Sequence, residues 1–421
     1  MSTHLRGGRA LLLVVLAAVW VLSRAWLLHL LSGSQEWVDG DLAYFAQSLG
    51  SLGERGLART LVEYPLPAVG VIAVPYLAAT GDPDRFRVVF HAVAAITDLL
   101  FTVALWWSTR RRSVLPLAAW VLAVPLLGAT AFARFDLLPG VLCGLVVLCL
   151  PRAPVPAGVL VAVAAGIKLW PALVVPPLLA VRHLRRRIGL GVAATGSALV
   201  LASVALAGVG RLLSPLTYQA DRGLQIESTF ATPVMVGWAL GGRTWQVAFA
   251  SSNSYEISGP GVATLLVLST AAVTAYVGCL LLTWGRLTWL ARAGCDADLP
   301  TVLWVALASV SGFVALGKVL SPQYLLWMLP VAIASVVVAD SRALRCWTAA
   351  LLAAALLTQL VFPTGYTVLI NHLPGVVRVV AFLAVRNVTM AALFVTAAWQ
   401  AGRGLLRTGE RRRPEVTSLR Q

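Results

Sequence analysis

Charged residues are scarce in this 421-residue chain: Asp, Glu, Lys and Arg make up 12% of it, whereas hydrophobic residues make up 59%. Typical soluble domains contain about 25% charged residues, so the composition excludes a water-soluble globular protein. Apolar stretches long enough to cross a bilayer recur along the whole chain. The sequence therefore predicts one all-α polytopic membrane protein rather than a string of soluble domains.

Cysteine is also sparse, with five residues that form no Cys-x-x-Cys pair and have no neighbouring histidine partner. This absence excludes both a disulfide framework and a zinc site. The acidic residues form no cluster of the kind that holds a divalent cation. We therefore expect neither a metal nor a cofactor.

Negative charge is the rarer sign, since 17 acidic residues face 33 basic ones and the net charge is +16. Such a chain could bind nucleic acid, but its arginines lie in short loops between apolar stretches, as the positive-inside rule describes. We therefore expect the lipid bilayer, and no nucleic acid, as a partner. The arginine clusters that predict cytoplasmic loops are 110–112, 182–187, 286 with 292, 342 with 345, and 403–413.

These loops and the apolar stretches together predict about twelve spans with both termini in the cytoplasm, the first being a retained signal anchor. The expected spans are 10–30, 86–108, 114–131, 135–150, 153–167, 170–182, 188–208, 261–285, 299–316, 322–339, 344–362 and 374–400. Residues 1–402 then form one transmembrane domain of the plasma membrane, and residues 403–421 a basic cytoplasmic tail. Residues 66–80 are also apolar enough to cross, but a full span there would place the 110–112 cluster outside. We interpret them as a re-entrant or interfacial helix.

Lysine is nearly absent: only Lys168 and Lys318 occur, and both lie in apolar, span-like stretches beside proline and aromatic residues. A charge inside a membrane segment usually faces a cavity or a partner, and an ammonium group can hold a phosphate. Both lysines lie near a predicted external end, so snorkelling to the interface is the alternative. Positive charge is disfavoured in external loops, which favours an anionic ligand at the external face.

Two carboxylates, Asp39 and Asp41, follow the first span in a predicted external segment, about residues 31–65. Apolar residues at helical spacing after Asp41 predict a short amphipathic helix on the membrane surface. Asp41 could act there as a general base, given a reachable proton and a tuned pKa. It could instead be the N-cap of that helix, which residue type alone favours, and Asp39 is the alternative base.

Further candidates lie in the other predicted external loops. Glu63 and Tyr64 either line a sugar pocket or mark a helix start with an interfacial tyrosine. Arg134 and Asp136 either pair with each other or bind phosphate and a sugar hydroxyl. The remaining candidates lie in the large loop 209–260 and in the 317–324 turn, and are Arg222, Glu227, Gln323 and Tyr324. The polar stretch around Arg222 and Glu227 is either a solvated loop or a hydrogen-bonding wall for a polar acceptor.

Taken in order, these motifs resemble glycosyltransferase family 87 of the GT-C superfamily, which includes polyprenyl-phosphate-mannose-dependent mannosyltransferases of actinobacteria. The motifs are Asp41-Leu42-Ala43-Tyr44, Glu63-Tyr64-Pro65, Arg134-Phe135-Asp136-Leu137-Leu138-Pro139, Gly166-Ile167-Lys168-Leu169-Trp170-Pro171, Asp221 to Ser228, and Lys318 to Trp327. The resemblance implies a GT-C-type bundle with a catalytic aspartate in the first external loop, which corresponds to Asp41. Two departures are Pro65-Leu66-Pro67, where many members have a double proline, and Gln323 with Tyr324, where some members have histidines.

The implied activity is that of an inverting hexosyltransferase that requires no metal. Lys168, Lys318 and Arg134 would hold the phosphate of a polyprenyl-phosphate sugar, and Asp41 would deprotonate a hydroxyl of a glycolipid or glycan acceptor. The competing class is a transporter or flippase for a lipid-linked anion. Asp98, inside the second predicted span, fits that class better, whereas the loop carboxylates and the lack of a clear internal repeat favour the enzyme.

Overall fold

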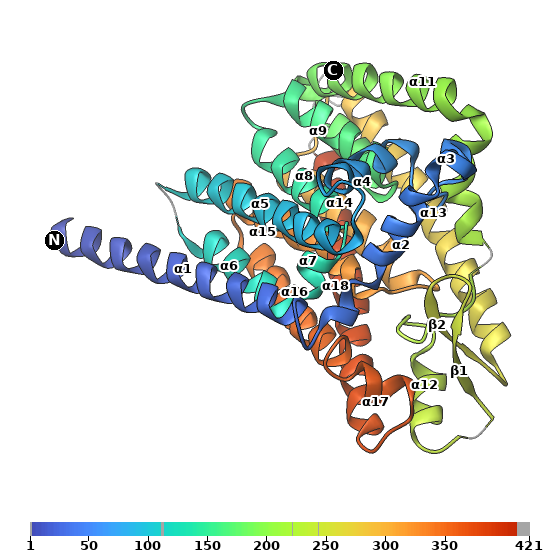
Figure 1. The fold of residues 1–421 in the computed structure, drawn as a ribbon. Coiled ribbons are helices and arrows are strands. Elements are labelled where there is room, and N and C mark those ends of the chain that lie inside the picture. The colour runs from blue at the N-terminus through green and yellow to red at the C-terminus, as the bar shows by residue number, and fades with distance from the viewer. Residues whose placement is uncertain (1, 111–112, 221, 243, 411–421) are drawn as a thin grey trace, which may run out of the picture.

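The computed structural model describes residues 2–110, 113–220, 222–242 and 244–410, which form a bundle of helices (Figure 1). The predicted all-α membrane architecture is confirmed, and each predicted span overlaps one or more helices. These helices are α1 (Ser2–Leu31), α5 (Pro83–Thr109), α6 (Leu115–Leu127), α8 (Leu137–Cys149), α9 (Pro154–Ile167), η3 (Trp170–Val174) with α10 (Val175–Leu179), α11 (Arg182–Ala220), α13 (Val262–Arg292), α14 (Leu299–Leu316), α15 (Leu325–Val338), α16 (Arg342–Val361) and α18 (Val376–Glu410).

The helices fall into two length classes. Within the described residues, seven are long and apolar enough to cross a membrane, namely α1, α5, α11, α13, α14, α16 and α18. The others are shorter: α8 has 13 residues, which at 1.5 Å per residue is roughly 20 Å, less than the hydrocarbon core of about 30 Å. The number of about twelve crossings therefore stays a prediction.

Small residues let some of these helices approach closely. Gly140 on α8 lies against the backbone of α15, where an added Cβ would meet the carbonyl oxygen of Leu326 at 2.1 Å. Gly158 on α9 lies in the same way against the carbonyl oxygen of Ile188 on α11, at 2.2 Å. Such close approach of small residues is the usual way in which membrane helices pack. It fixes α8 and α9, whose ends carry Asp136 and Lys168, inside the bundle.

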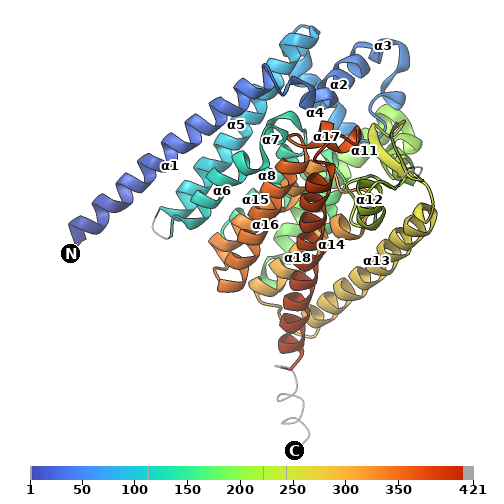
Figure 2. The same ribbon diagram turned by 90° about the horizontal axis from the view of Figure 1, so that it is seen from below.

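Short elements gather near one end of the bundle, which we call the loop end, while the start of α1 and the last described turns of α18 lie toward the other (Figure 2). They are η1 (Glu36–Asp39), α2 (Gly40–Gly50), α3 (Leu52–Arg55), η2 (Leu57–Arg59), α4 (Leu66–Ala78), α7 (Thr130–Ala133), α12 (Thr232–Ala239), β1 (Gln246–Ala250), β2 (Ser254–Ser258), η4 (Pro322–Tyr324) and α17 (Tyr366–Ile370). The α4 helix coincides with the range interpreted as re-entrant or interfacial. Its 13 residues reach roughly 20 Å.

The predicted loop 209–260 is more ordered than expected. α11 continues past Gly208, where φ is 80° and ψ is 168°, and runs on to Ala220. The expected span end at residue 208 therefore coincides with a non-helical break, and a second helical stretch follows it to Ala220 inside the predicted loop. Beyond it, β1 and β2 pair antiparallel, with Ala248 opposite Glu256, a hairpin that the all-α prediction missed.

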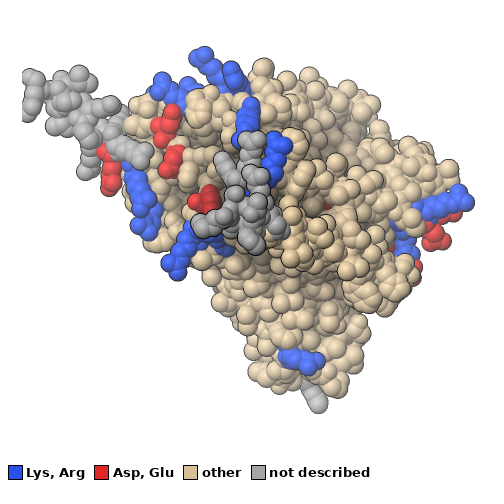
Figure 3. Space-filling model, turned by 90° about the vertical axis from the view of Figure 1, so that its left-hand side faces the viewer, with Lys and Arg blue, Asp and Glu red and all other residues tan. Residues whose placement is uncertain are grey.

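The predicted basic regions lie partly in the described chain. α18 runs on to Glu410, so the tail expected from residue 403 begins as helix, and residues 411–421 lie outside the described part, as do Arg111 and Arg112. Arg182, Arg186 and Arg292 are exposed. Figure 3 shows basic side chains in patches around a broad uncharged surface on one face of the molecule, with fewer acidic ones.

Candidate active site

Asp41 lies in the first turn of α2, and its carboxylate forms an ion pair with Arg134, Oδ1 to Nη1 2.7 Å. The N-cap of α2 is Asp39, whose side chain makes no capping hydrogen bond. The interpretation of Asp41 as the N-cap is therefore wrong. The Asp41 side chain is 37% exposed, so its carboxylate is held on one side and open to a ligand on the other.

Arg134 and Asp136 are close in sequence but face different partners. Arg134 has extended backbone after α7, whereas Asp136 stands at the start of α8. Asp136 is 2% exposed and accepts hydrogen bonds from the Lys168 ammonium at 2.7 Å and from the Trp327 indole. The interpretation of Arg134 and Asp136 as a mutual pair is wrong, since each has a different ion-pair partner.

Lys168 ends α9 with extended backbone, at φ −152° and ψ 139°. Its Nζ lies 2.7 Å from Asp136, 5.0 Å from the ring centroid of Tyr64 and 5.9 Å from that of Trp327. These distances combine an ion pair with cation–π contacts. At 18% exposure, the ammonium is directed into the protein rather than snorkelling toward the interface.

Glu63 and Tyr64 complete this cluster from the segment before α4. Tyr44 donates a hydrogen bond to Oε2 of Glu63 at 3.1 Å, and the Tyr64 ring packs edge-on against Phe45 and Phe135. Burial raises the pKa of Glu63 above its ordinary value of 4.5. Burial also raises the pKa of Tyr64 well above 10, and the carboxylates of Asp41 and Asp136 add to that rise, so Tyr64 stays a neutral phenol.

The structure thus brings together six of the residues proposed from sequence: Asp41, Glu63, Tyr64, Arg134, Asp136 and Lys168. Their carboxylates differ in availability. Asp136 is occupied by Lys168 and Trp327, and Glu63 is partly buried and accepts a hydrogen bond from Tyr44. Asp41 is the carboxylate of this cluster with substantial exposure, and it is therefore the group suited to accept a proton from a substrate.

Asp39, the alternative base, is engaged elsewhere. It is 4% exposed, and its Oδ2 lies 3.1 Å from Nε of Arg87 and 3.4 Å from Nε2 of His91. Arg87 also contacts Glu36. This cluster ties η1 and the start of α2 to α5, and so fixes the position from which Asp41 projects.

Lys318 lies half-buried in the turn between α14 and η4. Its carbonyl oxygen accepts a hydrogen bond from the backbone N–H of Gln225 at 3.1 Å, and the Gln225 side chain accepts one from the N–H of Leu320 at 2.7 Å. Gln225, which is 3% exposed, was not among the residues proposed from sequence. It fixes the backbone of the lysine-bearing turn against the segment that follows α11.

Gln323 and Tyr324 lie in η4, and Tyr324 belongs to a stack of aromatic rings. The rings of Tyr324 and Trp327 have centroids 4.0 Å apart, and Trp327 stacks on Trp170 at 5.2 Å. Trp327 also donates to Asp136. The stack therefore joins the 317–324 turn to the pair of Lys168 and Asp136.

Glu227 is 1% exposed and pairs with Arg386 of α18, Oε2 to Nη1 3.0 Å. Arg386 also donates to the Glu227 carbonyl, and Asn387 donates to the Ser228 carbonyl. The interpretation of this segment as a solvated loop is therefore wrong. Arg386 was missed, although an arginine in the middle of a predicted span carries the same signal that singled out the lysines.

Arg222 contacts the hairpin that sequence reasoning did not predict. Its Nη2 donates to Oγ of Ser254 at 3.1 Å and to the carbonyl of Ser252 at 3.4 Å. The same hairpin contacts the segment before Glu227, because Ile226 N donates to the Tyr255 carbonyl at 3.1 Å. Arg222 and Glu227 are thus held by two different elements.

Asp98, which fitted a transporter, is fully buried and pairs with Arg24 of α1, Oδ2 to Nε 3.0 Å. Arg24 also donates to the Val121 carbonyl of α6 at 2.6 Å. This charge in the membrane region therefore has a partner on a neighbouring helix. It ties α1, α5 and α6 together.

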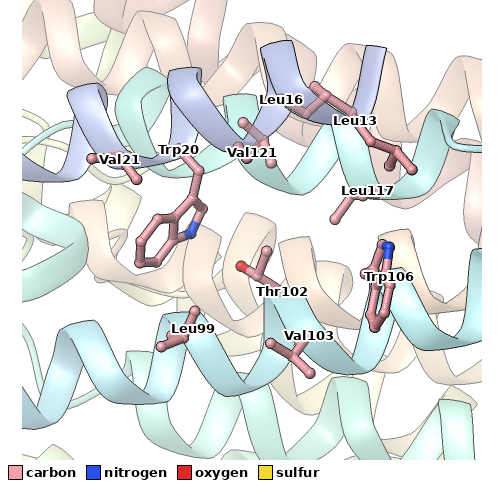
Figure 4. Close-up of a pocket in the computed structure, with 11 residues that line it drawn as sticks. Leu13, Leu16, Trp20, Val21, Leu99, Thr102, Val103, Trp106, Leu117 and Val121 are labelled. Carbon is pink, nitrogen blue, oxygen red and sulfur yellow. The ribbon is translucent and has the colours of Figure 1, made fainter. Parts of the chain in front are cut away.

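A cavity of about 270 Å³ lies among α1, α5 and α6, lined by residues such as Trp20, Leu99 and Val121 (Figure 4). Its lining contains no charged side chain, so it lacks the groups needed to bind a phosphate. A smaller crevice between α4, α5 and α8 includes Arg134 in its lining. In the part of the chain that the structure describes, no group of three or more His, Cys, Asp or Glu side chains could hold a metal ion.

Comparison with known proteins gives one family. Residues 62–250 match the model of glycosyltransferase family 87, which confirms the recognition made from the sequence motifs. The matched range contains Glu63, Tyr64, Arg134, Asp136 and Lys168. No curated protein and no solved structure matches the chain.

Proposed function

We propose that this chain, whose residues 62–250 match glycosyltransferase family 87 and whose described part has seven helices long enough to cross a membrane, is a hexosyltransferase that moves mannose from a polyprenyl-phosphate donor to a lipid-linked or cell-envelope glycan acceptor. The observation that carries the proposal is the cluster of Asp41, Arg134, Asp136 and Lys168. It places the ion pair of the partly exposed Asp41 with Arg134 beside that of the buried Asp136 with Lys168, at the loop end of the bundle.

The two cations have the chemistry to bind the donor phosphate. Lys168 is a point charge, and Arg134 offers a planar fork of N–H donors. The Nε of Arg134 is buried and makes no hydrogen bond within the described residues, so a phosphate oxygen could use it. Lys318, on the neighbouring turn, is the third proposed phosphate ligand.

Binding of the donor would also free the base. The Asp41 carboxylate is paired with Arg134. A phosphate that binds Arg134 competes for this guanidinium and leaves the Asp41 carboxylate open to the acceptor hydroxyl.

In the transfer step Asp41 takes the proton from an acceptor hydroxyl, whose oxygen forms a bond to the anomeric carbon. The bond from that carbon to the phosphate oxygen breaks, and its electron pair leaves with polyprenyl phosphate. Arg134, Lys168 and Lys318 stabilise the charge that develops on the leaving group. Attack opposite the leaving group inverts the anomeric configuration.

We further propose that the protein resides in the plasma membrane with both termini cytoplasmic and the loop end outside. Two observations support this orientation. The start of α1 and the last described turns of α18 lie toward the same end of the bundle, opposite the loop end (Figure 2), and the arginine-rich loops obey the positive-inside rule if that end is cytoplasmic.

The sequence feature that favoured a transporter or flippase was Asp98 inside a predicted span. In the structure Asp98 is paired with Arg24, so this feature no longer supports that function. The test is a transfer assay with the purified protein in liposomes, radiolabelled polyprenyl-phosphate mannose and an alkyl mannoside acceptor. We expect a labelled disaccharide product from this donor and none from a nucleotide-activated mannose. Movement of the labelled donor between leaflets without any product would instead identify a flippase.

A further inference from the structure

Arg211 lies on α11 three residues beyond the kink at Gly208, and it is 3% exposed. Its guanidinium donates hydrogen bonds to four backbone carbonyls of the segment 57–64. The acceptors are the oxygens of Leu57 at 3.3 Å, Thr60 at 3.1 Å, Leu61 at 2.9 Å and Tyr64 at 2.8 Å.

The segment 57–64 has little structure of its own to hold it in place. Apart from η2 it contains no helix or strand, and Leu61 adopts a φ of 48°, which is unfavourable for a residue with a side chain. Ser214, one turn after Arg211, adds a hydrogen bond from its Oγ to the Val62 carbonyl at 2.8 Å. The conformation of the segment is therefore imposed by side chains of α11.

This segment carries two residues of the candidate site. The carbonyl of Tyr64 accepts from Arg211, while the Tyr64 ring lies 5.0 Å from the ammonium of Lys168. Glu63, the preceding residue, accepts from Tyr44 on α2. A shift of the segment would move both residues relative to Lys168 and Asp136.

We propose that Arg211 is a positioning residue for sugar transfer, which holds Tyr64 and Glu63 against the pair of Lys168 and Asp136. Its role requires a guanidinium, because a planar fork reaches several diverging carbonyls at once, whereas an ammonium acts from a single point. The kinetic part of this inference rests on the proposed function; the conformational part does not.

The test uses Arg211→Lys, with Arg211→Gln as a second variant, and measures hydrogen exchange of residues 56–65 in the full-length protein. We expect faster exchange there than in the wild type, while α2 and α5 keep their protection. The matched control is Arg24→Lys, a buried arginine of α1 paired with Asp98, which should leave the exchange of residues 56–65 unchanged. Wild-type protection of this segment in both Arg211 variants would overturn the proposal.

A double-mutant cycle with Tyr64→Ala tests the functional link. We expect Arg211→Lys to lower kcat/KM by about tenfold to a hundredfold in the wild-type background, as small misplacements at a site do. In the Tyr64→Ala background the further loss should be under about threefold, because residues that act together are not additive. Full additivity would overturn the positioning role. A wild-type protein that transfers no sugar would refute the proposed function, and the exchange measurement would still decide whether Arg211 holds the segment.

Discussion

Lys168 and Asp136 show why a single substitution at the candidate site measures two effects at once. Lys168→Ala would remove a proposed phosphate ligand and also leave Asp136, 2% exposed, without its cation. Breaking a buried ion pair from one side costs about 3–5 kcal/mol, whereas replacing both partners by apolar residues of similar size is often neutral. Stability and ligand binding can therefore be separated by a double substitution.

We expect Lys168→Ala to lower the free energy of unfolding in detergent by about 3 kcal/mol, and Lys168→Met with Asp136→Leu to recover most of it. Donor binding should be lost in both. A double variant that binds polyprenyl phosphate as tightly as the wild type would show that Lys168 does not hold the phosphate.

Glu63 predicts a pH dependence of stability. Burial raises its pKa above 4.5, although the hydrogen bond from Tyr44 and the charges of Arg211 and Lys168 oppose the rise. The folded protein then keeps this proton at pH values where the unfolded chain has lost it, so this contribution to stability falls as pH rises from 4.5 through the folded pKa. Thermal unfolding between pH 4.5 and 7 should show this slope in the wild type and a flatter one in Glu63→Gln. Equal slopes would contradict it.

At this scale the sequence predicted which residues gather, but not how they pair. The rarity of lysine singled out Lys168, and the loop carboxylates singled out Asp41. The sequence did not show that Arg134 pairs with Asp41 and Asp136 with Lys168, because spacing along the chain does not decide between a mutual pair and two separate partners. Arg211 was missed because it acts through contacts with carbonyls more than 140 residues earlier in the chain.

At the scale of elements, hydropathy located the membrane helices well, because apolar stretches of span length are a strong signal. The extension of α11 beyond Gly208 was not predicted, since the less apolar residues after the kink are typical of a loop. The hairpin of β1 and β2 was missed for a similar reason. Its strands have no strict alternation of buried and exposed residues, with Gln246 to Ala250 mostly exposed.

The kink gives a prediction for α11. Gly208 has φ 80° and ψ 168°, a region that is essentially restricted to glycine, and other residues there cost about 1–3 kcal/mol. We expect Gly208→Ala to lower stability by about that amount and to increase hydrogen exchange of residues 57–64, because Arg211 lies beyond the kink. Gly196→Ala, at a helical position of the same helix with open space around it, is the control and should be neutral or slightly stabilising, because alanine favours a helix over glycine. A Gly208→Ala variant with wild-type stability would contradict the prediction.

At the scale of the whole molecule, the proposed orientation places the loop end outside the cell. In a cysteine-free background we expect Glu54→Cys, on α3, to react with a membrane-impermeant maleimide in intact cells. Arg292→Cys, at the end of α13, should react only after permeabilisation. Both positions are exposed, so access to the reagent depends on the side of the membrane. The reverse pattern would invert the topology and place the site in the cytoplasm.

The central claim is that Asp41 is the base of a sugar transfer at the loop end, and one comparison tests it most directly. In the liposome assay with polyprenyl-phosphate mannose, Asp41→Asn should reduce transfer by about 10²–10⁴-fold, the usual contribution of a general base, while donor binding persists. Asp39 lies two residues before Asp41 and contacts Arg87. The Asp39→Asn variant alters that contact and should still transfer sugar in the folded fraction. Wild-type rates in Asp41→Asn, above all with an inactive Asp39→Asn, would contradict the account.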